Sequence, residues 1–237
     1  MRVTHQSKWG MLGAMALAVA SLISAKPARA QAVQWQTLND EVTSLYRAGK
    51  YDHAVVVATK ALAVAEKEMG AEHPNVATSL NNLALLYETQ GQYAAAEPLY
   101  ERALGIWEKA LGKDHPNVAT SLNNLASLYH TQAQYAAAEP LFKRSLAIYE
   151  KVHGPDHPLV ATSLNNLAAL HHTQGQYAVA EPLYTRALAI NEKAHGAHHP
   201  DVATSLENLA MLYRKTDRAK DAEPLEARAK KIREIKR

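Results

Sequence analysis

"HPNVATSLNNLALLYETQGQY" occupies residues 73–93, and residues 115–135 read "HPNVATSLNNLASLYHTQAQY". Related copies open at His157 and His199, so the four copies follow one another at a spacing of 42 residues. A fixed period of this length predicts a solenoid, in which no single unit can bury its apolar face alone. The repetition therefore decides the fold before any other feature of the chain is considered.

A fifth, weaker copy precedes the four, because Gly49-Lys50-Tyr51 stands 42 residues before Gly91-Gln92-Tyr93. Residues 31–237 are thus expected to form a single domain of five units and little else. The expected units are residues 34–72, 73–114, 115–156, 157–198 and 199–237.

Each unit reads as two helices. Pro74 suits the first position of a helix, where a missing N–H leaves no hydrogen bond unmade. An apolar stripe at helical spacing follows it, made of Ala77, Leu80, Leu83, Ala84 and Tyr87. A turn at residues 90–92 leads to a second expected helix over residues 93–111, which Gly112 ends. Pro98 lies inside that helix, so a late start or a mild bend is expected there.

The residues Leu83, Ala84, Tyr87, Tyr93, Ala96, Tyr100 and Ala103 resemble the tetratricopeptide repeat signature. The 42-residue period and the "HPxVATSLNNLA" opening are similar to the repeats of kinesin light chains and their bacterial relatives. The resemblance covers residues 35–237 and implies an all-α, right-handed superhelical solenoid of about five antiparallel helix pairs. It departs from the signature at Glu41 and Val42 in the first unit and at Ala219 and Glu226 in the last, which would make these units polar caps.

One polar face of each first helix points away from the packed stripe. On a helical wheel, Leu83, Ala84 and Tyr87 lie close to Leu80, whereas Asn82 lies on the opposite side. The resemblance implies that this opposite side lines the concave groove of the superhelix. The candidate peptide-binding residues of the groove are Thr78, Asn82, Leu85, Thr89, Thr120, Asn124, Ser127, Thr131, Thr162, Asn166, Ala169, Thr173, Thr204 and Asn208.

Asparagine is a poor choice in mid-helix for stability, so the row of asparagines calls for a reason. An asparagine amide can both donate to and accept from the backbone of an extended peptide, which favours recognition. The alternative is that the amides join neighbouring first helices and set the superhelical pitch. The second asparagine of each pair favours recognition, and Asn81, Asn123 and Asn165 favour the structural role.

The chain opens with the features of a signal peptide. Arg2 and Lys8 precede an apolar run over residues 11–25, and Ala28-Arg29-Ala30 fits a cleavage site, so residues 1–30 are the expected signal and Gln31 begins the mature chain. An uncleaved anchor is the alternative. We expect a periplasmic or secreted bacterial protein without stable membrane insertion after cleavage, and the absence of cysteine fits that destination.

Charge argues against a nucleic-acid partner. The signal removes four of the 26 Lys and Arg residues, which leaves the mature chain near neutral against 23 Asp and Glu. The basic tail from Arg214 onward mixes both signs and reads as a solvated terminal helix. The groove lacks the lysines and arginines with which related repeats grip a carboxylate terminus. At the groove rim, one repeat position runs from Glu88 through His130 and His172 to Arg214, a gradient that could orient a charged ligand or reflect drift at an exposed site.

Enzymatic chemistry is not expected. No nucleophile motif, phosphate loop or isolated carboxylate pair stands out from the repeats. The segment "HGAHHP" over residues 195–200 invites a metal reading, but it falls in a turn between units, and the corresponding turn at Asp114-His115-Pro116 carries one histidine and no second ligand. No metal and no cofactor are therefore expected. The sequence therefore predicts a non-enzymatic protein-binding scaffold that takes an extended peptide or a partner helix in its groove. The alternative is a structural subunit of the cell envelope that forms homo-oligomers through its end units or convex face.

Overall fold

The computed structural model describes residues 33–235, and all the regular structure in that range is helical. The expected signal peptide lies outside the described residues. A first helical stretch covers residues 33–47. The helices after it are α2 (Tyr51–Met69), α3 (Pro74–Thr89), α4 (Tyr93–Leu111), α5 (Pro116–Thr131), α6 (Tyr135–His153), α7 (Pro158–Thr173), α8 (Tyr177–His195), α9 (Pro200–Lys215) and α10 (Ala219–Ile235).

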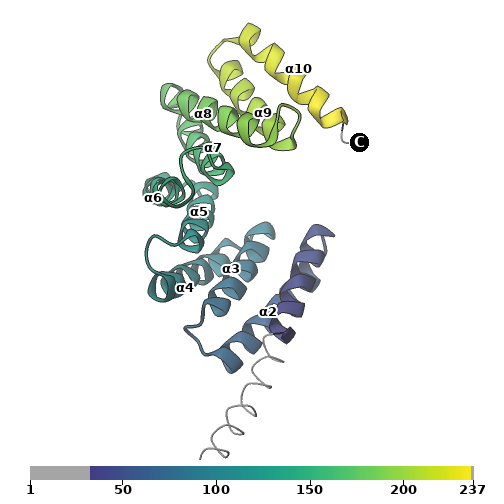
Figure 1. Ribbon diagram of the computed structural model, residues 1–237, viewed down its shortest axis with the longest axis vertical. Helices are drawn as coiled ribbons and strands as arrows, with labels where there is room; N and C mark the ends of the chain where they lie inside the picture. The colour runs from purple at the N-terminus through teal and green to yellow at the C-terminus, as the bar shows by residue number, and fades with distance from the viewer. Residues whose placement is uncertain (1–32, 236–237) are drawn as a thin grey trace, which may run out of the picture.

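Successive helices form antiparallel pairs, and the pairs stack into an arc (Figure 1). Among the odd-numbered helices, α3 contacts α5, α5 contacts α7 and α7 contacts α9, whereas no two even-numbered helices approach as closely in the described range. Elements on the inner side of a curved stack lie closer together than those on the outer side. The odd-numbered helices therefore line the concave side, as the family resemblance implies.

The expected helix boundaries are confirmed within the described residues. Helix α4 runs from Tyr93 to Leu111, and Gly112 follows it with a φ of 89°, a left-handed conformation that favours glycine. The expected late start at Pro98 is wrong, because α4 begins at Tyr93 and carries Pro98 inside. Pro98 is exposed and can remove only its own backbone hydrogen bond, so one turn of helix forms ahead of it.

A capping device that the sequence analysis missed starts each odd-numbered helix from α3 onward. The histidine before the proline accepts a hydrogen bond through Nδ1 from the backbone N–H two residues later. The donors are Asn75, Asn117, Leu159 and Asp201, and the acceptors are His73, His115, His157 and His199. The repeated His-Pro dipeptide was its signal, since a capped helix start needs both an acceptor and a residue suited to the first turn.

The core lies between the two helices of each pair and between neighbouring pairs. The expected stripe residues Leu80 and Ala84 are fully buried, and Leu83 is nearly so. Burying a leucine side chain contributes about 1.5–3 kcal/mol, so the recurrence of these leucines supplies most of the stabilisation. Small residues on the second helix, Ala96 and Ala103 in α4, are also fully buried and let the helices approach closely.

Ion pairs tie the outer helices of neighbouring pairs together. Arg144 lies 2.6 Å from Glu108, and the equivalent pairs are Arg102–Glu66, Arg186–Glu150 and Arg228–Glu192. All are partly exposed, so each adds at most about 1 kcal/mol. They hold the register of the convex side, while the concave side carries a different set of contacts.

Candidate functional site

The fourteen candidate groove residues all lie on the odd-numbered helices, and none of them is buried. Their neighbours on the same helices, such as Leu122 and Ala126 in α5, are fully buried against the partner helix. The first helices thus turn one row of polar and small side chains toward the concave side of the arc.

The second asparagines form hydrogen bonds between neighbouring helices. Asn82 donates through Nδ2 to Asn39 Oδ1 at 3.1 Å, Asn124 to Asn81 at 3.0 Å, and Asn166 to Asn123 at 2.9 Å. We call these three bonds the amide ladder. The ladder is the arrangement that the structural alternative predicts, in which amides join successive first helices.

The ladder leaves part of each amide free. Within the described residues, the Oδ1 atoms of Asn82, Asn124 and Asn166 accept no hydrogen bond, and they are not among the buried polar atoms without partners. One N–H fixes the orientation of the side chain, while the carbonyl oxygen has no partner within the described residues. An amide held in one rotamer loses less entropy on binding a ligand than a mobile one. The structural role and the recognition role are therefore compatible.

The groove threonines use their hydroxyl groups as donors within their own helices. The hydroxyls of Thr78, Thr120, Thr162 and Thr204 donate to the proline carbonyl four residues earlier in their own helices, and those of Thr89, Thr131 and Thr173 donate to equivalent backbone carbonyls. Because the single O–H of each threonine is used internally, only oxygen lone pairs remain for a ligand. The groove thus offers mostly acceptors, which suit backbone N–H donors.

The ladder stops before α9. Asn208 makes no hydrogen bond in the described part of the chain, and Asn165 Oδ1, which would be its partner, is buried without one. Asn165 instead turns its Nδ2 toward Ser205 Oγ at 3.4 Å. The last step of the inner surface is therefore more open than the others.

A cleft of about 370 Å³ lies at this open step, between α7 and α9. Five of the candidate groove residues line it, with Asn191 from α8 at its edge. They are Thr162, Asn166, Ala169, Thr204 and Asn208. Asn191 has the place that Trp107 and Tyr149 take in the two preceding units. The Tyr149 hydroxyl lies 2.7 Å from Thr120, whose equivalent Thr162 lines the cleft, so the smaller Asn191 leaves open a space that an aromatic ring fills one unit earlier.

Local contacts and burial weaken the charge gradient at the rim. Glu88 accepts a hydrogen bond from the Tyr100 hydroxyl at 2.8 Å, and burial raises the pKa of Glu88 although that hydrogen bond opposes the rise. Burial lowers the pKa of His130 and of His172, so both are held neutral. Arg214 lies 2.6 Å from Glu226, which offsets its charge. The rim therefore presents little net field to a ligand.

Comparisons with known proteins place the chain among helical repeats. The model of the tetratricopeptide repeat matches residues 36–109, 90–151, 133–193 and 174–235. A comparison with curated protein sequences finds no match. No helix within residues 33–235 combines the length and the apolar character needed to cross a bilayer.

Three solved structures have the same helical arrangement. BtubC (BKLC) from P. vanneervenii is 26% identical with a TM-score of 0.76, over 91% of this chain and 85% of that one. A Podosopora anserina protein described as a kinesin light chain with nearly identical TPR-like repeats is 26% identical with a TM-score of 0.70, over 86% and 97%. The apo form of RapI, at 17% identity, shares the fold with a TM-score of 0.69, over 86% and 71%.

Proposed function

This chain belongs to the tetratricopeptide repeat family, whose members generally act as protein interaction scaffolds, and we propose that it binds an extended peptide along its concave groove. The observation that carries the proposal is the row of solvent-accessible amides and threonines on the inner helices, in which Asn82, Asn124 and Asn166 are held in place by hydrogen bonds within the protein. Amide and hydroxyl groups of this kind can pair with the N–H and C=O groups of a peptide backbone.

The cleft between α7 and α9 is the anchor of this proposed site. Its Asn166 and Asn208 each keep an unused carbonyl oxygen. The hydroxyl oxygen of Thr162 can accept from a backbone N–H group, whereas that of Thr204 already accepts from Arg233 Nη2 at 2.9 Å. Each such bond adds only about 0.5–1.5 kcal/mol net, so several must form together, and a side chain of the peptide that fills the cleft adds apolar burial. We propose further that the binding partner is met outside the cytoplasm, on the strength of the signal-like residues 1–30.

The cleft can be closed by a substitution that the chain itself uses. Asn191→Tyr restores the aromatic residue of the preceding unit, and its hydroxyl can reach Thr162 as Tyr149 reaches Thr120. Peptides selected from a display library with the purified protein as bait should bind Asn191→Tyr at least about tenfold more weakly, a difference of about 1.4 kcal/mol. Asn166→Ala combined with Asn208→Ala should weaken the same peptides without closing the cleft.

The matched control is Thr185→Ala on α8. Thr185 is exposed and bonds only to the Glu181 carbonyl of its own helix, so the change should leave binding untouched. Titration calorimetry measures each affinity, and far-UV circular dichroism checks that every variant is folded. Peptides that bind wild type and Asn191→Tyr equally would refute the groove as the site. A library that yields no binder, together with a stable oligomer in light scattering, would favour the envelope-assembly alternative.

A further inference from the structure

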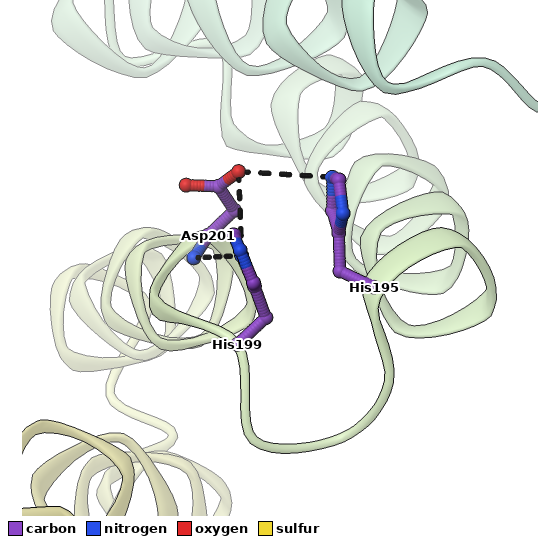
Figure 2. A group of neighbouring side chains, drawn as sticks. All are labelled: His195, His199 and Asp201. Carbon is purple, nitrogen blue, oxygen red and sulfur yellow. Dashed lines mark hydrogen bonds and ion pairs between the residues drawn. The ribbon is translucent and has the colours of Figure 1, made fainter. Parts of the chain in front are cut away.

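Two histidines and an aspartate meet where the last helix pair begins. His195 ends α8, His199 caps α9, and Asp201 lies in the first turn of α9 (Figure 2). Asp201 Oδ2 is 3.8 Å from His195 Nε2 and 3.5 Å from His199 Nδ1, and the two imidazole rings stack with centroids 4.3 Å apart. One ligand atom from each residue lies within 4.8 Å of the others, and no other group of this kind occurs in residues 33–235.

These distances are close to those of a metal centre. Zinc binds imidazole nitrogen and carboxylate oxygen at about 2.0–2.2 Å, so two ligand atoms at a tetrahedral angle lie about 3.3 Å apart. The two separations to Asp201 Oδ2 exceed that value by half an ångström or less, and the ligand nitrogens of the two histidines lie within 4.8 Å of each other. The side chain of Asp201 is 55% exposed and that of His195 is 27% exposed, which leaves room for the rings to turn out of their stack and face one ion.

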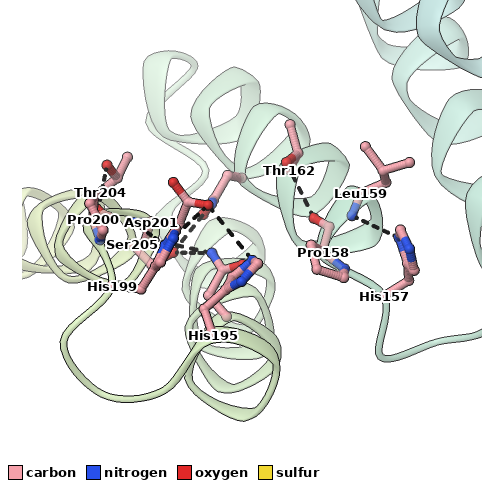
Figure 3. A network of polar contacts seen from close by, with 12 residues as sticks. His157, Pro158, Leu159, Thr162, His195, His199, Pro200, Asp201, Thr204 and Ser205 are labelled. Carbon is pink, nitrogen blue, oxygen red and sulfur yellow. Dashed lines mark hydrogen bonds and ion pairs between the residues drawn. The ribbon is translucent and has the colours of Figure 1, made fainter.

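The chain contains a natural comparison one unit earlier. His153 and His157 stack in the same way, with centroids 4.4 Å apart and the same interplanar angle, but Leu159 stands where Asp201 does (Figure 3). In the two units before that, Leu111 and Met69 replace the first histidine, and asparagines replace the aspartate. The full set of two histidines and a carboxylate is therefore present at one junction of the five units.

We propose that His195, His199 and Asp201 bind a divalent first-row transition metal ion such as Zn²⁺. Imidazole and carboxylate together suit ions of this class better than Ca²⁺ or Mg²⁺, which prefer oxygen ligands. In binding, His199 Nδ1 exchanges its cap hydrogen bond from the Asp201 N–H for the metal, while the Asp201 carboxylate keeps the helix start anchored. Three protein ligands leave a coordination position open to water or to a group of a bound partner.

No metal is expected from the sequence, because the corresponding turn at residues 114–116 carries one histidine and no second ligand. That expectation leaves out Asp201, which follows the cap by two residues and is brought against the histidines only when α9 packs beside α8. Asp201 also lines the cleft between α7 and α9, so the metal site and the cleft share a wall.

Zinc titration of the purified protein by calorimetry tests the proposal. Wild type should bind one Zn²⁺ per chain, and Asp201→Asn and His195→Ala should each weaken binding by about tenfold or more, since even changes beyond the direct ligands cost metal sites that much. His153→Ala is the matched control and should bind as wild type does, because its stacked pair lacks a carboxylate. Leu159→Asp should create a second site of similar affinity and raise the stoichiometry to two.

Three results would overturn the proposal. The first is the absence of zinc binding by the wild-type protein. The second is binding that Asp201→Asn leaves unchanged, and the third is an equal loss in His153→Ala, which would indicate diffuse capture by the 12 histidines. The gain of a site in Leu159→Asp keeps the test informative even if a loss variant folds poorly, because it adds a ligand at an exposed position.

Discussion

Asn124 and Asn208 occupy the same position in two units, but only Asn124 forms a bond of the amide ladder. Asn124→Ala removes the 3.0 Å hydrogen bond to Asn81, whose side chain is only 9% exposed. The lost bond contributes about 0.5–1.5 kcal/mol, and leaving the Asn81 oxygen without a partner adds part of about 1–3 kcal/mol. Alanine returns about 0.6 kcal/mol because it is the better helix former.

The net expectation for Asn124→Ala is a loss of about 1–2 kcal/mol, or roughly 2–8 °C in Tm for a chain of this size. Asn208→Ala breaks no such bond, so its Tm should stay unchanged or rise slightly. Thermal and urea unfolding followed by far-UV circular dichroism measure both variants. Equal effects of the two substitutions would refute the reasoning, because the two sites differ mainly in the ladder bond.

Tyr100→Phe should cost about 1–3 kcal/mol in urea unfolding, since it leaves the partly buried Glu88 carboxyl without the hydrogen bond that the Tyr100 hydroxyl donates. Phe142 shows that phenylalanine fits the equivalent site. Tyr184→Phe is the control, because its hydroxyl has no partner within residues 33–235, and a similar loss there would assign the effect to packing. Stability should also fall as pH drops through about 6.5, because the lowered pKa values of His130 and His172 mean that the unfolded chain binds more protons than the folded one. The double variant His130→Gln with His172→Gln should flatten that slope in unfolding measured between neutral and mildly acidic pH, and an unchanged slope would contradict the assignment.

The helix pairs could be predicted from sequence because their signals are local and repeated. Pro74 marks a helix start, Gly112 marks a stop, and the period-3.6 stripe through Leu80 and Ala84 identifies the packed face. Each signal depends on residues a few positions apart. Four copies in register make an error in any one of them easy to see.

The types of residue that line the groove could be predicted from the sequence, but the contacts they make could not. The wheel separates Asn82 from Leu80, but it cannot show that Asn82 reaches Asn39 across 43 positions of sequence. The cleft depends on Asn191, which replaces the aromatic residue of the two preceding units, and it opens only where three helices meet. The cluster of His195, His199 and Asp201 could not be predicted for the same reason, since its members come from two helices and the turn between them.

Many of the contacts that join neighbouring units span nearly one period, and this has a consequence for chain length. If residues 115–156 were excised, Asp114 would join His157, and Asn166 would meet Asn81, Arg186 would meet Glu108 and Lys193 would meet Asp114. Each of these partners has the chemistry of the one it replaces, as the observed pairs Asn124–Asn81, Arg144–Glu108 and Lys151–Asp114 show. Whole 42-residue units can therefore be lost or duplicated without placing mismatched residues against each other. Evolution or protein engineering can thus lengthen the solenoid one unit at a time while the first and last units stay unchanged.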